Sequence, residues 1–421
     1  MQYRIDKKTG NKISVLSFGC MRFPSMFGKT DMRKTEEMIV RSIDAGVNYF
    51  DTAWIYPGNE EALGSVLHKN NLRYKVNIAT KLPLILLKDD FNANDFDRYL
   101  NQSLERLKTD YIDYYLLHMI TDMDQWNKLK TRGIVNWISQ KKSAGIIKHI
   151  GFSFHGQAPE FLKIINDYNW ELTQIQYNYF DENFQAGVSG LRAAAAKMPV
   201  IVMEPLLGGK LATGLPKEAV SIFNNAEAPA GLETDFLNPP VEKKRKKLSP
   251  AGWALAWLWN QAEVTSVLSG MSTMEQLDEN LMLAESAAAD VLNESHMAVY
   301  KSVLELLNRS CKVKCTGCNY CMPCPEGVNI PGAFSAYNAR YSMGYMEGIK
   351  QYATSTGMTQ VKSGSPDQCN KCGKCELRCP QKISIINELV IVHKKMEPWF
   401  IKLAGTGARA FLGKKRKQKS Y

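Results

Sequence analysis

Short apolar runs alternate with longer segments of helical pattern over the first 270 residues of the chain. Eight such runs, rich in β-branched and aromatic residues, lie at 13–19, 47–51, 76–81, 112–118, 149–153, 173–178, 199–204 and 265–270. Near-continuous apolar strands that alternate with helices are typical of parallel sheets covered on both faces. Eight strand–helix units predict an α/β fold, a closed (β/α)8 TIM barrel. A doubly wound open sheet is the alternative, which the lack of a G-x-G-x-x-G motif after the first run weakens.

Signals for helices lie between and after the apolar runs. Ser249 and Pro250 open an apolar segment as an N-cap and a first-turn proline, which predicts a buried helix. Residues 214–248 are rich in Pro, Asn and Lys, and we expect a long loop there. Helical pattern covers residues 274–307, and helix-like stretches recur between 325 and 368. We therefore expect a smaller, mainly helical domain to follow the barrel.

Length and composition place the chain among globular proteins. Its 421 residues include 45% hydrophobic and 23% charged side chains, enough for a large core and an appended domain. The apolar run at 253–259 is far shorter than the roughly 20 residues that span a bilayer, and the N-terminus lacks an apolar signal region. We expect a cytoplasmic protein with no transmembrane segment, divided into a barrel at 1–307, a second domain at 308–395 and a basic tail at 396–421.

The positive charge is concentrated in two runs. The formal net charge is +11, and residues 243–247 and 414–419 hold much of the excess. Such runs are usually solvated loops or tails, and docking to an acidic redox partner or to a membrane surface is the alternative. Neither run is interleaved with aromatic side chains that would stack on bases, so we expect no nucleic-acid binding.

The second, third and fourth apolar runs each end in an ionisable side chain. Asp51 closes the second run, Lys81 the third and His118 the fourth. In a parallel barrel the strand ends meet at the carboxyl-terminal rim, where such folds build their active sites. Tyr56 lies five residues beyond Asp51, on a loop that can return over the same rim. A carboxylate, an ammonium, an imidazole and a phenol are therefore expected at one site.

This set of groups suits the reduction of a carbonyl. A phenol has an ordinary pKa of about 10, and a neighbouring lysine cation held by a carboxylate stabilises its anion. Tyr56 would then protonate the developing alkoxide, while His118 polarises and orients the carbonyl. None of these side chains supplies a hydride, so a nicotinamide cofactor is implied. Each residue alone also has a structural explanation, as a helix cap, a surface residue or a core histidine.

Seven motifs in order resemble the aldo-keto reductases. They are GCMRFP, DAGVNYFDTAWIYPGNEEALG, the Lys of IATK, the His of YYLLH, GIIKHIGFS, QIQYN and SGMSTMEQLDENL, and the resemblance covers roughly residues 1–290. It implies a (β/α)8 barrel that binds NADP or NAD in an extended form and reduces an aldehyde or ketone, a small carbonyl substrate, to an alcohol. By this resemblance the catalytic tetrad is Asp51, Tyr56, Lys81 and His118.

The resemblance also assigns cofactor contacts. Ser153 and Gln174 would hold the nicotinamide carboxamide, the loop from Pro205 would skirt the pyrophosphate, and Glu279 with Asn280 would meet the adenine. The full set of expected contacts is Ser153, Gln174, Pro205, Leu206, Gly208, Gly270, Met271, Ser272, Gln276, Glu279 and Asn280.

Three positions depart from the family pattern. The usual Ser-Asn pair reads Ser153-Phe154, which removes one expected carboxamide hydrogen bond. The lysine and arginine that commonly grip a 2′-phosphate align with Gly270 and Gln276. Without those cations a phosphate loses charge-assisted hydrogen bonds worth about 1.5 to 3 kcal/mol each. The expected cofactor is therefore NADP or NAD, without a preference for NADP.

Nine of the ten cysteines fall between residues 311 and 379, and eight of them form two motifs. The first is C-x2-C-x2-C-x2-C-P and the second is C-x2-C-x2-C-x3-C-P, the bacterial ferredoxin spacing. In two-cluster ferredoxins the fourth cysteine of each motif ligates the other cluster. We therefore expect one [4Fe-4S] centre on Cys315, Cys318, Cys321 and Cys379, and another on Cys369, Cys372, Cys375 and Cys324.

The competing interpretation of these motifs is a pair of structural zinc sites. Zinc motifs usually separate two C-x2-C pairs by a dozen or more residues, whereas four cysteines crowd together in each motif here. Cys311 is left over, and we expect a buried thiol, with a substitute ligand as the alternative. Cys20 lies within a strand pattern and is expected in the core.

Residues 308–390 resemble the dicluster ferredoxin-like domain that follows the barrel in a bacterial branch of aldo-keto reductases, through CTGCNYCMPCPEGVNIP and CNKCGKCELRCP. The main hypothesis is an NAD(P)H-dependent aldehyde or ketone reductase whose clusters have a structural or accessory redox role. Hydride transfer moves two electrons and each cubane moves one, so a redox partner protein is a further possibility. The alternative function is an iron-sulfur electron-transfer protein whose barrel binds a nucleotide or a partner.

Overall fold

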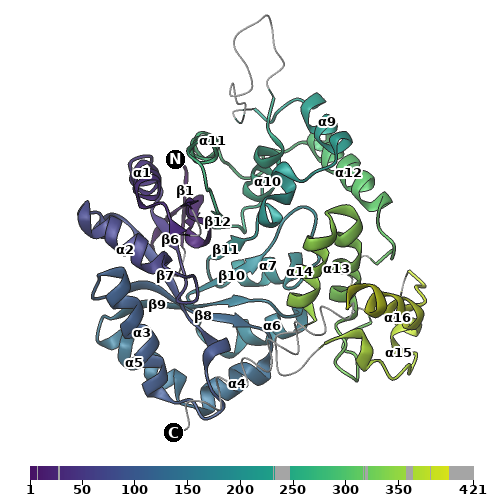
Figure 1. Cartoon of the computed structure of the whole chain (residues 1–421), viewed down its shortest axis with the longest axis horizontal. Helices are drawn as coiled ribbons and strands as arrows, with labels where there is room; N and C mark the ends of the chain where they lie inside the picture. Colours follow the sequence, from purple (N-terminus) through teal and green to yellow (C-terminus); the bar gives the residue numbers. More distant parts are fainter. Residues whose placement is uncertain are drawn as a thin grey trace, which may run out of the picture. The chain divides into compact units, whose positions relative to one another are not determined.

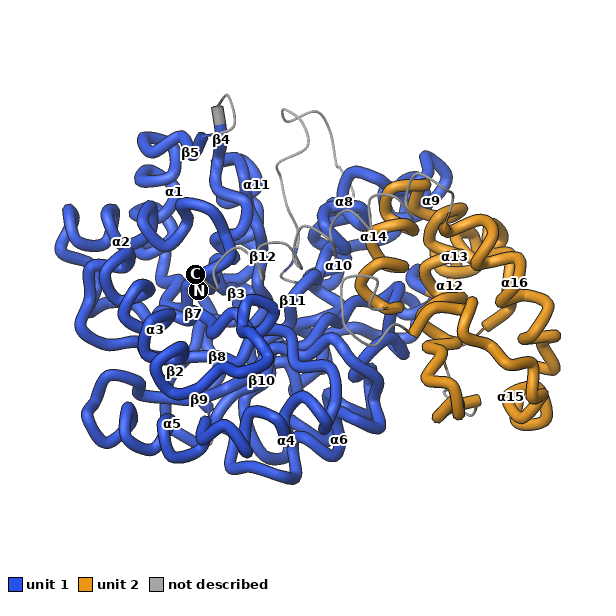
Figure 2. Tube along the Cα trace, turned by 60° about the horizontal axis from the view of Figure 1, so that its bottom comes forward, with its two compact units in different colours: residues 1–300 blue, residues 301–421 orange. Residues whose placement is uncertain are grey.

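The computed structural model describes two compact units of the chain. The described residues are 1–6, 8–26, 29–230, 232, 247–315, 317, 321–356, 364–379 and 381–397. Unit 1 comprises residues 1–300 and unit 2 residues 301–421 (Figure 2). The division falls within the helix α12 (Glu294–Arg309), and the predicted boundaries at 307 and 396 stay predictions. No helix of the described part is long and apolar enough to cross a membrane.

Eight parallel strands close into a barrel in unit 1 (Figure 1). They are β3 (Leu16–Gly19), β6 (Tyr49–Asp51), β7 (Asn77–Leu82), β8 (Ile112–Ile120), β9 (Ile147–Phe154), β10 (Leu172–Gln176), β11 (Val200–Met203) and β12 (Ser266–Ser269). Each of the eight predicted runs overlaps one of these strands, and β12 pairs with β3 to close the ring. The predicted (β/α)8 barrel is confirmed.

Helices surround the barrel strands of unit 1. Unit 1 also has two short hairpins, one before β3 and one after it. The helices are α1 (Met32–Asp44), α2 (Asn59–Lys69), α3 (Ala93–Leu107), α4 (Met123–Thr131), α5 (Ile134–Ser143), α6 (Ala158–Asp167), α7 (Gly187–Ala195), α8 (Lys210–Thr213), α9 (Lys217–Asn225), α10 (Pro250–Trp259), α11 (Met274–Glu285) and α12. The hairpins are β1 (Tyr3–Ile5) with β2 (Lys12–Ser14), and β4 (Ser25–Met26) with β5 (Lys29–Thr30). Ser249 caps α10 by accepting a 2.9 Å hydrogen bond from the Gly252 N–H, as predicted.

The prediction of a loop over residues 214–248 is wrong for part of that range. Helix α9 lies inside it, because Ala219 and Phe223 stand one helical turn apart and both are buried. The Phe223 ring stacks on Trp253 of α10 with 5.6 Å between ring centroids. Apolar spacing therefore outweighs the local content of Pro, Asn and Lys. Residues 231 and 233–246, including most of the first basic run, lie outside the described part.

The interior of the barrel holds an apolar layer below its carboxyl-terminal end. Its buried members are Ile13, Tyr49, Ala79, Tyr114, Leu116, Leu172, Ile201 and Leu268. Side chains alternate between the two faces of a strand, so residues two positions further along point into the barrel as well. On β6, β7 and β8 those positions are Asp51, Lys81 and His118. The fold thus places the predicted polar residues directly after the apolar layer.

Unit 2 is mainly helical, as predicted. Its helices beyond α12 are α13 (Ile330–Ser342), α14 (Tyr345–Ser355), α15 (Lys374–Arg378) and α16 (Ile385–Met396). A buried core includes Phe334 and Tyr352, and six cysteines of the two motifs pack against it. These six are Cys315, Cys321, Cys324, Cys369, Cys375 and Cys379. The cysteine motifs therefore fold around one small core.

Candidate active site and iron-sulfur site

Strand register brings three members of the predicted tetrad together. Asp51 pairs with Ala79 of β7, and Lys81 follows two residues later on the same face. Lys81 pairs with Leu116 of β8, and His118 again follows two residues later. On each successive strand the polar side chain therefore lies two residues nearer the carboxyl-terminal rim, inside the barrel.

Lys81 and Asp51 form a buried ion pair. The Lys81 Nζ lies 2.7 and 2.6 Å from the two Asp51 carboxylate oxygens and 2.7 Å from the Thr52 carbonyl oxygen. Each of the three N–H groups of Lys81 donates a hydrogen bond to one of these oxygens. Lys81 is 2% exposed and Asp51 is 5% exposed. A buried charge is tolerated only when it is paired and hydrogen-bonded, and this pair meets that condition.

Tyr56 and His118 lie beside this ion pair. The Lys81 Nζ stands 5.5 Å from the centroid of the Tyr56 ring. The Tyr56 and His118 rings meet edge to face, with 6.1 Å between centroids. Tyr56 is only partly buried, whereas His118 is buried. The structure therefore brings all four predicted residues together, and Tyr56 is the one that is partly exposed.

The electrostatics of Tyr56 differ from the expectation. Burial raises the pKa of the Tyr56 phenol, and the charges of Asp51 and Glu204 raise it further. The expected lowering by Lys81 is not found, because Asp51 balances the lysine charge at short range. The phenol is protonated at neutral pH, which is the form that a proton donor needs.

His118 is held in its neutral form. Burial lowers the pKa of His118 well below its ordinary value, and the charges of Lys81 and His155 lower it further. A neutral imidazole can donate one hydrogen bond to a carbonyl oxygen without competing for the proton of Tyr56. This agrees with the orienting role that the sequence predicts for His118.

Two ionisable residues near the tetrad escaped the sequence analysis. Glu204 follows β11 and raises the pKa of Tyr56, and His155 follows β9 and lowers that of His118. The His155 Nδ1 lies 3.3 Å from the Gln185 Nε2, which donates a 3.0 Å hydrogen bond to the Gln176 Oε1. Both residues stand at strand ends, so the rule that found Asp51 would also have found them.

The expected nicotinamide contacts lie side by side but make other bonds. Gln174 of β10 pairs in register with Ser153 of β9, and both are buried. The Gln174 Nε2 donates a 2.5 Å hydrogen bond to an Asp51 carboxylate oxygen. The Ser153 hydroxyl accepts a 2.8 Å hydrogen bond from the N–H of Met119, whose positive φ of 64° lies at an irregularity in β8. Gln174 thus orients Asp51, and Ser153 anchors the irregularity beside His118.

The loop after β11 is bridged to the loop after β3. Arg22 donates a 2.8 Å hydrogen bond from Nη1 to the Gly208 carbonyl oxygen. The aliphatic part of the Arg22 side chain passes Gly270: a Cβ added at Gly270 would lie 3.5 Å from the Arg22 Cδ. Pro205 is buried and Leu206 is partly buried in the same loop. The loop after β3 therefore brings a cation to Gly208, with its aliphatic stem beside Gly270, the position at which the sequence lacks a cation.

The turn after β12 caps α11. The Thr273 hydroxyl accepts a 3.3 Å hydrogen bond from the Gln276 N–H, and the Gln276 Oε1 accepts a 2.9 Å bond from the Ser272 N–H. The Asn280 Nδ2 donates a 2.8 Å bond to the Ser269 hydroxyl, while Met271 is buried and Glu279 partly buried. Gln276 stands where the family commonly has a cation, and here its side chain takes part in capping α11.

A cavity of about 920 Å³ lies against this turn, at the carboxyl-terminal side of the barrel. Its lining includes Arg22, Arg33, Lys34, Ser272 and Thr273. The three cations come from the loop after β3 and from the start of α1. Glu37 and Glu275 line the cavity as well, and Glu37 pairs with Arg33 at 2.7 Å, so an anionic group would meet both cations and carboxylates there.

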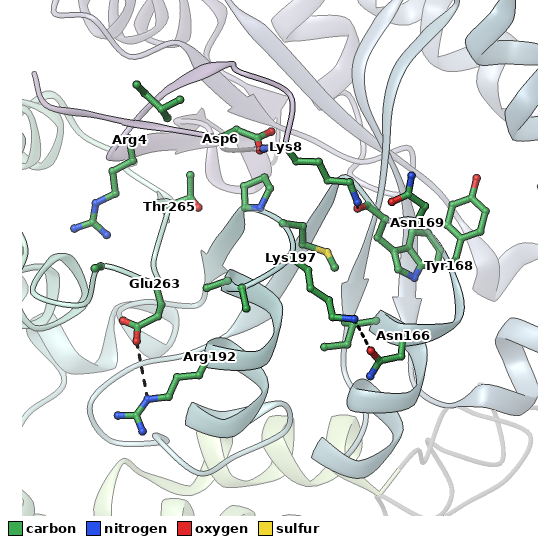
Figure 3. A pocket seen from close by; sticks show the side chains of 18 residues that line it. Arg4, Asp6, Lys8, Asn166, Tyr168, Asn169, Arg192, Lys197, Glu263 and Thr265 are labelled. Carbon is green, nitrogen blue, oxygen red and sulfur yellow. Dashed lines mark hydrogen bonds and ion pairs between the residues drawn. The ribbon is translucent and has the colours of Figure 1, made fainter.

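A second cavity, of about 830 Å³, lies at the opposite end of the barrel (Figure 3). It is lined by residues just before β10, β11 and β12, among them Trp170, Pro199 and Thr265. In Figure 3 Lys197 points to Asn166, and its Nζ donates a hydrogen bond of 2.5 Å to the Asn166 Oδ1. None of the tetrad lines this cavity, so it is not the site that the sequence predicts.

Five cysteines line a cavity of about 250 Å³ in unit 2, and four of them are Cys324, Cys369, Cys372 and Cys375. They are the four ligands that the motif spacing assigns to one cluster, and Cys321 also contributes to the lining. Within the described residues, no three Cys, His, Asp or Glu side chains approach closely enough to hold a single metal ion.

The other cysteines divide into a second set and two single residues. Cys315, Cys321 and Cys379 pack on the same core, and Cys318, the fourth expected ligand, lies outside the described residues. Cys20 is fully buried, as predicted. The Cys311 Sγ donates a 3.4 Å hydrogen bond to the Asn308 Oδ1, and burial raises the pKa of this thiol.

Comparison with family models assigns both parts of the chain. The model of the aldo/keto reductase family matches residues 15–304, more than half of the chain. The chain belongs to the aldo/keto reductase family. The 4Fe-4S dicluster domain model matches residues 314–384. This aldo/keto reductase is therefore an NAD(P)-dependent oxidoreductase with a 4Fe-4S dicluster domain that follows the barrel in the sequence, as the sequence predicts.

Curated relatives of this aldo/keto reductase match its barrel. L-glyceraldehyde 3-phosphate reductase of Escherichia coli K12 is 26% identical over 309 residues, 67% of this chain and 87% of that protein. L-galactose dehydrogenase of Arabidopsis thaliana is 24% identical over 306 residues, 70% of this chain and 92% of that protein.

Solved structures support the same fold. AKR11C1 from Bacillus halodurans, in its holo form, is 22% identical with a TM-score of 0.53, over 72% of this chain and 96% of that one. An aldo-keto reductase from Klebsiella pneumoniae in complex with NADPH is 19% identical with a TM-score of 0.54, over 70% of this chain and 92% of that one.

Proposed function

We propose that the barrel reduces an aldehyde or ketone to an alcohol, with Tyr56 as the proton donor. The observation that carries this proposal is the buried Lys81–Asp51 pair beside Tyr56 and His118 at the rim. A bound nicotinamide supplies the hydride to the carbonyl carbon. The phenol O–H bond of Tyr56 breaks, and its proton goes to the carbonyl oxygen, which becomes the alcohol hydroxyl.

Lys81 and Asp51 set the charge around the reacting phenol. When Tyr56 gives up its proton, the ammonium 5.5 Å from its ring centroid is the cation beside the phenolate, and the Asp51 charge opposes part of its attraction. Asp51 holds that ammonium in place, and Gln174 holds Asp51. Neutral His118 donates a hydrogen bond to the carbonyl oxygen and orients it toward Tyr56.

The test of these roles is Lys81→Met. We expect kcat for aldehyde reduction to fall by roughly 10²- to 10⁴-fold, because general acid catalysis contributes about that factor. Lys128→Met, which removes an exposed lysine, is the matched control and should leave kcat unchanged. Carbonyl reduction that persists unchanged in Lys81→Met would refute the assignment of the tetrad.

For the cofactor we propose NADP, with the nucleotide along the rim from Ser153 to Asn280. A structural neighbour is a complex with NADPH, and the Arg22 stem passes Gly270, where the family cation is absent, to bring its guanidinium to the Gly208 carbonyl. The buried amide of Gln174 and hydroxyl of Ser153 fit a nicotinamide carboxamide. Fluorescence titration with NADPH and NADH tests this choice. Arg22→Gln should weaken NADPH binding roughly tenfold and NADH binding less.

For the second domain we propose two [4Fe-4S] clusters, held by the two ligand sets that the motif spacing predicts. The cavity among Cys324, Cys369, Cys372 and Cys375 supports the second of these sets. Protein purified without oxygen should contain about eight iron atoms and eight sulfide ions per chain. Replacement of Cys372 by Ser should lower that content by about half. Because the cluster ligands are reduced thiols, we also propose a cytoplasmic location.

A second candidate function is electron transfer through the clusters, which the dicluster domain favours. Stopped-flow mixing with NADPH, without oxygen, separates the two functions. Clusters that bleach during turnover carry electrons, and clusters that stay coloured have a structural role.

A further inference from the structure

The positive charge of the chain belongs to unit 2. Residues 301–421 contain 20 Lys and Arg against 7 Asp and Glu, whereas residues 1–300 contain 33 against 35. The net charges are therefore +13 and −2. The thiolates with their clusters are anionic, so loading offsets part of this excess. A strongly cationic surface attracts anionic partners and raises their rate of encounter.

An exposed leucine lies on α15, one of the helices of unit 2. Leu377 is 90% exposed, the highest value for any large hydrophobic side chain in the described part of the chain. Lys374, Leu377 and Arg378 stand at helical positions i, i+3 and i+4, so they share one face. Lys371 and Lys382 flank the helix, and all four cations are exposed. An exposed apolar side chain ringed by charge is typical of an interaction site.

This face borders the cavity assigned to a cluster. Lys374 and Arg378 line that cavity, and Cys372, one of its cysteines, is itself exposed. Leu377 lies between Cys375 and Cys379, which the motif spacing assigns to different clusters. A protein docked here would therefore approach the cluster from its most accessible side.

Few carboxylates oppose these cations. The Glu376 Oε1 accepts a 2.8 Å hydrogen bond from the Ile386 N–H. The Glu326 Oε1 accepts a 2.7 Å bond from the Asn370 Nδ2, and Asp367 is exposed. Lys371, Lys374, Arg378 and Lys382 have no ion-pair partner among the described residues. Their charges are therefore free to face a partner.

We propose that the Leu377 patch, made of Lys371, Lys374, Leu377, Arg378 and Lys382, docks a small acidic protein that carries one electron at a time. The proposal rests on the presence of the clusters in the proposed function. Each cubane exchanges single electrons, so its partner is a one-electron carrier. The patch is small, which suits the weak encounters of electron-transfer proteins, whose interfaces bury less than about 1,200 Å². The same patch on a second copy of this chain would meet like charge.

The test uses the full chain with its clusters loaded and an acidic plant-type [2Fe-2S] ferredoxin as the probe. Binding is measured by biolayer interferometry at several salt concentrations. We expect the affinity to fall with salt, since the Debye length is about 10 Å at 0.1 M. Lys374→Glu with Arg378→Glu should weaken binding by at least tenfold, and Leu377→Gln roughly tenfold. Cytochrome c, a basic one-electron carrier, should not bind.

Matched variants separate the patch from general charge and hydrophobicity. Met346→Gln removes another exposed apolar side chain of unit 2, and Lys301→Glu with Lys394→Glu reverses two other exposed cations. Both should bind the ferredoxin nearly as the wild type does. Iron content and the visible spectrum are checked in every variant, so a loss of clusters is seen separately.

Three results would overturn the proposal. The first is that the cluster-loaded wild type does not bind ferredoxin, and the second is that the patch and control variants lose equal ferredoxin affinity. The third is that the protein binds phosphatidylserine vesicles in place of ferredoxin, in a way that depends on Lys374 and Arg378. That third result would assign the patch to a membrane surface. Aldehyde reduction by the barrel is assayed in parallel and does not require docking. A failed reductase with intact docking therefore overturns the proposed function alone.

Discussion

The buried Lys81–Asp51 pair predicts a large coupling between two substitutions. Both partners are nearly inaccessible and lie within hydrogen-bond distance. Removal of one partner from a buried pair leaves an uncompensated charge, which costs about 3 to 5 kcal/mol. Asp51→Asn and Lys81→Met should each lower the free energy of unfolding by an amount in that range. The double variant removes both charges, so its loss should be smaller than the two single losses together by about 2 kcal/mol or more.

The assay for this coupling is urea unfolding followed by tryptophan fluorescence. Seven of the eight tryptophans lie in residues 1–300, so the signal reports mainly on the barrel. The exposed pair Lys128–Asp89, with 3.0 Å between Nζ and Oδ1, provides the matched cycle. An exposed pair is worth about 0 to 1 kcal/mol, and its coupling should be near zero. Losses below about 1 kcal/mol in the buried cycle, or losses that simply add, would refute the reasoning.

Two further predictions concern stability. Burial by itself raises the pKa of Glu171, but hydrogen bonds from His149, Lys142 and the Ile150 N–H outweigh it and lower that pKa to about 2. Because the folded pKa is depressed, this contribution is present above about pH 4.5 and is lost as the pH falls toward 2. Urea unfolding of Glu171→Gln should accordingly show a flatter loss of stability across that range than the wild type does, and equal slopes would contradict the account. Phe223→Ala should lower the melting temperature, with a loss of about 3 to 5 kcal/mol, because the ring stacks on buried Trp253. A variant that melts with the wild type would show that α9 is not packed as described.

The barrel was predictable because its signals are local and repeated. Every parallel strand is an apolar run long enough to be recognised, and Asp51, Lys81 and His118 each stand at the end of one. The closed ring then fixes which face they share, since side chains alternate along a strand. The cysteine motifs were predictable for a similar reason, because their spacing is short and their chemistry specific.

What the sequence missed depends on contacts between distant segments. Helix α9 forms because Phe223 finds Trp253, a partner that its own composition does not reveal. Arg22 reaches Gly208 across Gly270 only because β3, β12 and β11 are neighbours in the closed barrel. The raised pKa of Tyr56 likewise follows from burial and from Asp51, which balances the lysine charge. Such effects are set by three-dimensional packing.

The most direct test of the account is a single-turnover measurement of NADPH oxidation by an aldehyde, with the wild type and Tyr56→Phe compared without oxygen. Substitution of the phenol by a phenyl ring removes the proton and little volume. The account predicts that Tyr56→Phe binds NADPH as the wild type does and oxidises it roughly 10²- to 10⁴-fold more slowly. Equal rates of oxidation in the two proteins would contradict the claim that Tyr56 delivers the proton.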